Sequence, residues 1–219
     1  YEMGLDIMAR AAYENGDSEL AESVALKLLE IDNQNTTPYD ILLKIYISKD
    51  LIHFEKQGII VPNITYSEFV QMAQSLKVDK NYYQNHKFYY KKSDPEKKII
   101  LWDKNVIFFP RRINGNLVFL HRIRPGIQIV SVKEINDLTQ EFWMDYFNSF
   151  QKNILFDPYY EHESCYIGGG CPPIETPEGW ILIYHGVKYE NRPVYSACAA
   201  LLDLNDPSII LARLPYPLF

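Results

Sequence analysis

The feature that most constrains the fold of this 219-residue chain is a change in its hydrophobic period near residue 45. Apolar residues recur at helical spacing before that point and fall into short extended runs after it. The runs are KIIL (98–101), VIFF (106–109), LVFL (117–120), IQIV (127–130), WILIYH (180–185), YSACAALL (195–202) and IILA (209–212). Turn-forming pairs such as Asn114-Gly115 and Pro125-Gly126 separate them. Strands at this density, without helices between them, predict antiparallel sheets, as in a sandwich, barrel or propeller.

The first segment, residues 1–47, is predicted to be helical. The stretch ELAESVALKLLEID (19–32) carries one apolar stripe, and Thr37 followed by Pro38 supplies a cap and a first-turn proline for another helix. The pattern resembles a tetratricopeptide or pentatricopeptide repeat, and it covers little more than one repeat unit. Because such units bury their apolar faces only by stacking, the segment either packs on the β-rich part of the chain or belongs to a longer array.

The β domain is expected over residues 48–219, with an insertion at about 64–97. Within that insertion TYSEFVQMAQSLK (65–77) fits a helix, and YYQNHKFYYKKSDPEKK (82–98) is interpreted as exposed. The aromatic stretch FWMDYFNSF (142–150) is a connector whose form the pattern leaves open.

Charge and cysteine content exclude several classes of protein. The net charge of −6 lies in residues 1–50, which hold 10 of the 28 acidic and 4 of the 22 basic residues, so the remainder is neutral. A neutral surface lacks the basic stripe of a nucleic-acid-binding protein.

No apolar run approaches the ~20 residues of a membrane span, and no signal peptide is visible. Cys165, Cys171 and Cys198 lack CxxC spacing, so neither a disulfide framework nor a metal site is expected. We therefore expect a cytoplasmic protein.

Three ordered motifs carry a resemblance to a known family. They are DKNVIFFPRRINGNLVFLHRI (103–123), IGGGCPPIETPEGWILIYHGV (167–187) and LLDLNDPSIILAR (201–213). They are similar to successive motifs of glycoside hydrolase family 130, which comprises β-mannoside phosphorylases and related hydrolases on a five-bladed β-propeller. The resemblance covers about residues 45–219. It implies a mainly β fold, with an N-terminal helical segment and antiparallel strands that form a partial propeller.

The resemblance also implies a phosphate site at Lys104, Arg122 and His185. Each residue lies beside or within an apolar strand run, where a polar group is costly unless it is paired or lines a cavity. Arginine suits phosphate because its guanidinium is a bidentate fork, and lysine adds a point charge. By strand alternation His121 points to the face opposite Arg122. The residues predicted to contact the sugar are Asp103, Glu163 and Tyr184.

No general acid is assigned from the sequence. In the family that this chain resembles, an aspartate from an earlier blade assists departure of the leaving group. Here the helical repeat occupies that part of the chain. Asp40 is the nearest upstream carboxylate, and no motif supports it.

The leading functional hypothesis is an inverting β-mannoside phosphorylase, which transfers a mannosyl group to phosphate and releases mannose 1-phosphate. Its partners would be a β-mannoside oligosaccharide and inorganic phosphate as co-substrate, with no other cofactor. One alternative is a hydrolase of the same family, with Glu161 or Glu163 as base. Another is a non-catalytic interaction protein that binds a protein partner or a second copy through its helical segment. A chain that is incomplete or inactive also stays open.

Overall fold

The structure is a computed structural model that describes residues 46–48, 54–56, 60, 62, 64–84 and 99–219. The chain divides into two compact units, Tyr1–Ile60 and Val61–Phe219. In the first unit, strands β1 (Tyr46–Ser48) and β2 (Phe54–Lys56) pair antiparallel. The helical repeat predicted for residues 1–45 lies outside the described residues. Tyr46 and Ile47, which were expected to be helical, begin β1 instead.

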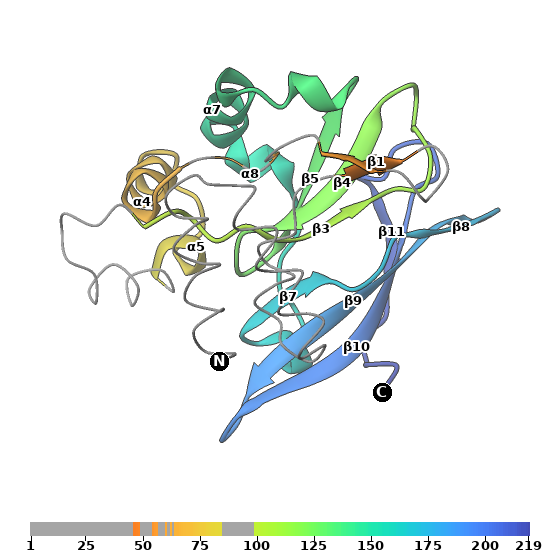
Figure 1. The fold of residues 1–219 in the computed structure, drawn as a ribbon. Coiled ribbons are helices and arrows are strands. Elements are labelled where there is room, and N and C mark those ends of the chain that lie inside the picture. Colours follow the sequence, from red (N-terminus) through yellow and green to blue (C-terminus); the bar gives the residue numbers. More distant parts are fainter. Residues whose placement is uncertain (1–45, 49–53, 57–59, 61, 63, 85–98) are drawn as a thin grey trace, which may run out of the picture. The chain divides into compact units, whose positions relative to one another are not determined.

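The first sheet of the second unit is a four-stranded antiparallel meander (Figure 1). Its strands pair in chain order: β3 (Lys104–Phe108), β4 (Leu117–Arg122), β5 (Ile127–Val132) and β6 (Ile154–Phe156). Asn114 and Gly115 form the turn before β4 with φ of 50° and 82°, the left-handed conformation that tight hairpin turns require. Five of the six β4 residues are buried, because helices and the second sheet pack against this strand.

The second sheet is also antiparallel, with the order β11-β10-β9-β7 and the short strand β8 paired to β9 (Figure 1). Its strands are β7 (Tyr166–Gly169), β8 (Ile174–Thr176), β9 (Gly179–Tyr189), β10 (Pro193–Leu202) and β11 (Ile210–Arg213). The β9–β10 hairpin keeps one register from Tyr189 opposite Pro193 to Trp180 opposite Leu202. This unbroken register makes the hairpin a long, regular support for residues at its centre.

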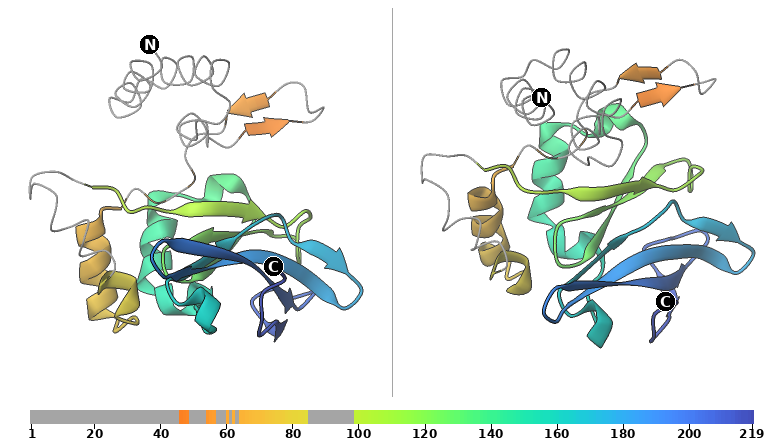
Figure 2. Two further views of the ribbon diagram at one scale, coloured as in Figure 1. Left: turned by 90° about the horizontal axis from the view of Figure 1, so that it is seen from below. Right: turned by 60° about the horizontal axis from the view of Figure 1, so that its bottom comes forward.

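The helices of the second unit are short and lie beside the first sheet (Figure 2). They are α4 (Tyr66–Ser75), α5 (Asn81–Gln84), α7 (Gln140–Asn148) and α8 (Phe150–Asn153), with 3₁₀ turns η1 (Ile135–Asp137) and η2 (Glu161–Glu163). Thr65 and Thr139 cap α4 and α7 with their hydroxyls, which accept from the backbone amides of Glu68 and Phe142. The aromatic connector whose form the sequence left open is therefore α7 and the start of α8.

Aromatic packing joins α4 and α5 to α7 and α8. Phe69 is 1% exposed, and its ring meets those of Phe147 and Phe150 at centroid distances of 5.9 and 5.4 Å. Tyr82 is fully buried and packs on Phe150 at 5.3 Å. The helix predicted within residues 65–77 is confirmed. The interpretation of residues from 82 onward as exposed is wrong for Tyr82, because its ring completes this aromatic cluster.

The main hydrophobic core lies between the two sheets. It comprises Phe109, Ile113, Val118, Leu120, Ile127, Leu155, Phe156, Ile167, Trp180, Leu182, Tyr184, Cys198, Ala200 and Leu202. Residues of β3 and β4 contact residues of β7 across this core, so polar side chains at the ends of these strands can meet. None of the helices in the described ranges is long and apolar enough to cross a membrane.

Six of the seven apolar runs form strands, as predicted. In the seventh run, the described residues 99–101 include one isolated bridge, between Ile100 and Thr65. The mainly antiparallel β class is confirmed. The described part of the second unit holds two antiparallel sheets and no closed propeller.

Candidate functional site

The pairing of β3 with β4 places Lys104 and Arg122 on one face of the first sheet. Their Cα atoms are direct partners in the antiparallel register, and directly opposed residues project to the same side. The chain bulges between Lys104 and Ile107, where Asn105 has a φ of 57°. The side-chain amide of Asn105 donates to the carbonyl of Gly169 at 3.1 Å. This hydrogen bond connects the bulge of the first sheet to β7.

Arg122 reaches His185 of the second sheet across a glycine. The guanidinium Nη1 of Arg122 donates to His185 Nε2 at 3.3 Å. Gly168 is the β7 partner of His185, and a Cβ at Gly168 would lie 2.8 Å from both Arg122 Nη1 and His185 Nε2. Real Cβ contacts are longer than this, so the close approach of the two side chains depends on glycine at this position.

The cluster of Lys104, Arg122 and His185, together with Arg124, carries positive charge that no carboxylate among the described residues neutralises by contact. Arg122 is 6% exposed, and its Nε is buried without a hydrogen-bond partner. Within the ranges that the structure describes, Lys104, Arg122 and Arg124 form no ion pair. The Lys104 ammonium lies 4.9 Å from the Trp102 ring. Buried guanidinium groups normally find acceptors, so this cluster is suited to an anion.

His185 is neutral near physiological pH. Burial and then the charges of Arg122 and Arg124 lower the pKa of the imidazole to about 4. Burial and the charge of Arg124 also lower the pKa of Arg122, yet guanidinium stays protonated in proteins. Since Arg122 can only donate, His185 Nε2 is the acceptor and the imidazole proton resides on Nδ1. His185 therefore offers a neutral donor beside fixed positive charge.

This arrangement predicts the titration of His185. In the absence of added anions, we expect its imidazole to titrate near pH 4 in NMR spectra of the labelled protein. Arg122→Ala should raise the pKa, because it removes the nearest positive charge and opens the site to water. Arg112→Ala should leave it unchanged, since Arg112 is exposed and pairs with Glu134 at 2.9 Å. A His185 pKa near its ordinary value of about 6.5 in the unmodified protein would contradict the assignment.

Asp103 pairs with His121, and its charge also acts on Arg122. Its Oδ2 lies 2.7 Å from His121 Nδ1, and His121 Nε2 lies 2.7 Å from the Tyr146 hydroxyl. The Asp103 side chain is 2% exposed and that of His121 is fully buried. These contacts confirm that His121 and Arg122 project to opposite faces. The predicted role of Asp103 as a sugar ligand stays a prediction, and its observed partner is His121.

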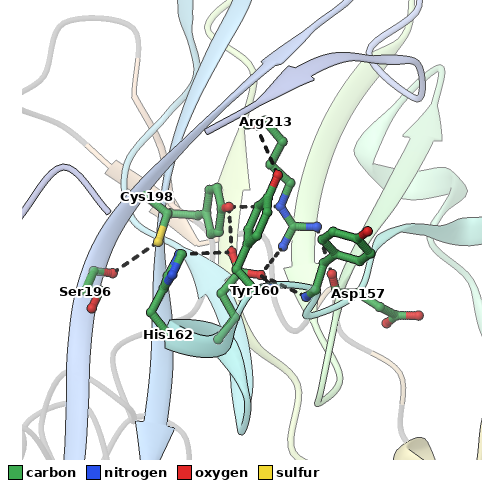
Figure 3. A network of polar contacts seen from close by, with 9 residues as sticks. Asp157, Tyr160, His162, Ser196, Cys198 and Arg213 are labelled. Carbon is green, nitrogen blue, oxygen red and sulfur yellow. Dashed lines mark hydrogen bonds and ion pairs between the residues drawn. The ribbon is translucent and has the colours of Figure 1, made fainter. Parts of the chain in front are cut away.

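Glu163 and Tyr184 belong to a separate buried network around Arg213, which Figure 3 shows from close by. Glu163 Oε2 accepts from Arg213 Nη2 at 2.6 Å and from the Tyr159 amide at 2.9 Å. Its Oε1 accepts from the Tyr184 hydroxyl at 2.7 Å. Both side chains are at most 1% exposed. The structure therefore does not bring them to the cation cluster, and their role as substrate ligands stays a prediction.

One group of metal-ligating residue types in the described ranges overlaps this network at Glu163. Ligand atoms of His162, Glu163 and Cys198 lie within 4.8 Å of one another. The guanidinium of Arg213 already neutralises the carboxylate, and burial raises the pKa of the Cys198 thiol, which disfavours thiolate. The donor set is thus poorly suited to a cation.

Sequence reasoning missed Arg124 and Tyr166. Arg124 follows Arg122 by two residues, and the alternation rule that separates His121 from Arg122 would have placed both arginines on one side. Tyr166 carries no local signal, because its contacts come from strands far apart in the chain.

Comparisons with known proteins identify the family of this chain. The family model described as beta-1,4-mannooligosaccharide phosphorylase, glycoside hydrolase family 130, matches residues 41–219. The chain is 41% identical over 121 residues to the Beta-1,2-mannobiose phosphorylase of Listeria innocua, covering 53% of this chain and 31% of that protein. It is 39% identical over 128 residues to the 1,2-beta-oligomannan phosphorylase of Thermoanaerobacter, covering 57% of this chain and 39% of that protein.

The solved structure of Beta-1,2-Mannobiose phosphorylase from Listeria innocua has a TM-score of 0.48 and 27% identity, over 80% of this chain and 37% of that one. The chain spans about a third of the length of the curated relatives that it matches. Because the family model matches most of its residues, the chain belongs to glycoside hydrolase family 130.

Proposed function

We propose that the cluster of Lys104, Arg122 and His185 binds inorganic phosphate, as part of an inverting β-mannoside phosphorylase that produces mannose 1-phosphate. The observation that carries the proposal is a buried guanidinium, Arg122, that forms no ion pair with any described residue and contacts a neutral histidine. Relatives named as phosphorylases of β-1,2- and β-1,4-linked mannosides support the substrate class. Two consecutive antiparallel sheets fit neighbouring blades of a five-bladed propeller.

Transfer of a mannosyl group to phosphate requires a positively charged site of this kind. An oxygen of phosphate bonds to the anomeric carbon, while the bond from that carbon to the leaving sugar oxygen breaks and that oxygen takes up a proton. Phosphate is already anionic at neutral pH, so it needs no general base. It needs fixed positive charge that holds it beside the sugar, and Arg122 and Lys104 supply that charge. The proton donor is not assigned to a residue.

The contacts of the two candidate bases favour phosphate over water as the nucleophile. An inverting hydrolase needs a carboxylate base with room for water beside it. Glu163 is fully buried and accepts hydrogen bonds at both oxygens. Glu161 is exposed and pairs with Lys188 at 2.5 Å. Neither carboxylate is placed to activate a water molecule.

Two measurements test the proposal. With β-1,2- or β-1,4-mannobiose, we expect consumption to require phosphate and to yield mannose 1-phosphate. By calorimetry, Arg122→Ala should weaken phosphate binding about tenfold or more, since a charge-assisted hydrogen bond contributes about 1.5–3 kcal/mol. Lys104→Ala should have a smaller effect, because Lys104 is exposed.

The controls are Arg112→Ala and Lys188→Ala, which remove equal charges from exposed ion pairs. They should bind phosphate as the unmodified protein does. Equal phosphate affinity in Arg122→Ala, or release of free mannose at the same rate without phosphate, would overturn the proposal.

A further inference from the structure

Two arginines lie against the ring of Tyr166. The guanidinium carbon of Arg124 is 3.8 Å from the ring centroid, and that of Arg122 is 5.0 Å away. The Tyr166 hydroxyl is 2.9 Å from that of Tyr195, which fixes the far end of the ring. Tyr166 therefore provides one aromatic support for both guanidinium groups, from a strand of the other sheet.

Neither guanidinium has its hydrogen-bonding capacity satisfied. Arg122 donates through Nη1 to His185. Among the residues that the structure describes, Arg124 has neither a hydrogen-bond acceptor nor an ion-pair partner, although it is only partly exposed. A guanidinium carries five N–H donors, so most of the donors of this pair are uncommitted. Other arginines of the same unit behave differently, since Arg111 and Arg112 pair with Glu175 and Glu134.

Like charges this close repel one another, and partial burial strengthens the repulsion. The charge of Arg124 lowers the pKa of Arg122 and also that of His185. Stacking on the Tyr166 ring offsets only part of the repulsion between the two guanidinium groups. An anion with several oxygen atoms would remove the repulsion and supply acceptors to both forks at once.

We propose that Arg124 is a second guanidinium ligand of the anion site, and that Tyr166 is a positioning residue that holds Arg124 and Arg122 for a tetrahedral oxyanion. The inference rests on the proposed phosphate site and adds a ligand that is not among Lys104, Arg122 and His185. A planar carboxylate presents only two oxygens in one plane, whereas phosphate and sulfate present oxygens to both forks. The pair thus selects tetrahedral dianions over carboxylates.

The test is calorimetric binding of phosphate, sulfate and acetate to the full chain. Arg124→Ala should weaken phosphate and sulfate binding about tenfold and change acetate binding little. Arg124→Lys should recover part of the loss, because it restores the charge without the fork. Tyr166→Phe keeps the ring and should bind phosphate within about twofold of the unmodified protein. Tyr166→Leu should lose about fivefold or more, with its melting temperature measured in parallel.

Arg112→Ala is the matched control, because it removes an arginine from an exposed ion pair. Failure of the unmodified protein to bind phosphate would defeat the proposed function itself. Tight phosphate binding that Arg124→Ala leaves unchanged would overturn only the role of Arg124. An equal loss of phosphate affinity in Tyr166→Phe and Tyr166→Leu would overturn the role of the aromatic ring. Equal weakening of acetate and phosphate binding by Arg124→Ala would overturn the selectivity for tetrahedral anions.

Discussion

Arg213→Met is expected to lower the free energy of unfolding by about 3–5 kcal/mol, because it leaves the carboxylate of Glu163 buried without its counter-charge. Arg213 Nη2 donates to Glu163 Oε2 at 2.6 Å, and Arg213 Nε donates to the Tyr184 hydroxyl at 2.9 Å. The Glu163 side chain is fully buried and that of Arg213 is 12% exposed. Urea unfolding of the full chain measures the change.

The exposed pair of Arg111 and Glu175 is the matched control. Arg111 contacts both oxygens of Glu175, the shortest distance being 2.7 Å, and the two side chains are 46% and 43% exposed. Arg111→Met should therefore cost at most about 1 kcal/mol. A double variant, Arg213→Met with Glu163→Leu, should be more stable than Arg213→Met alone, since it removes both charges. A loss below about 1 kcal/mol in Arg213→Met would contradict this account.

The same network fixes the pH dependence of the effect. Burial acts to raise the pKa of Glu163, but amide and hydroxyl hydrogen bonds and the charge of Arg213 outweigh it, so the pKa is lowered. A carboxyl group with a lowered native pKa contributes stability above its unfolded pKa of about 4.3, and that contribution is lost as the pH falls through the native value. The difference between the unmodified protein and Arg213→Met should therefore shrink below about pH 4.

The sheets were predictable because their strands carry long apolar runs between clear turns. Asn114-Gly115 is such a turn, and it adopts the positive φ angles that its residues favour. Strands β6, β7 and β8 were missed because each has only three or four residues, too few for a period to show. The burial of Tyr82 was missed because it depends on Phe150, far away in the chain.

The candidate site was predictable in composition and only partly in geometry. The family resemblance selected Lys104, Arg122 and His185, and the register of β3 with β4 and the contact from Arg122 to His185 bring them together. Strand alternation already separates Tyr184 from His185, and the structure gives Tyr184 a partner in the Arg213 network instead. The packing of Arg124 on Tyr166 required the second sheet, which no local pattern specifies.

Gly168→Ala is expected to reduce phosphate affinity about 100-fold while the protein stays folded. The new Cβ would lie 2.8 Å from Arg122 Nη1 and from the His185 ring, so both side chains must move. Displacing Arg122 and His185 together removes two hydrogen-bond donors to phosphate, which weakens phosphate binding more than losing either donor alone. The nearest atoms belong to side chains rather than to backbone, so the sheet can absorb the change by displacing them.

Gly115→Ala provides the control for general destabilisation. Gly115 has a φ of 82°, and a Cβ at this position meets nothing within 4 Å. Alanine is strained there by about 1 kcal/mol through its backbone alone. The residue lies in the turn before β4, and we expect this variant to melt earlier yet bind phosphate normally. If Gly168→Ala binds phosphate as Gly115→Ala does, then the contact between Arg122 and His185 does not set the affinity. If instead only Gly168→Ala loses phosphate, the close approach that glycine permits is what assembles the anion site.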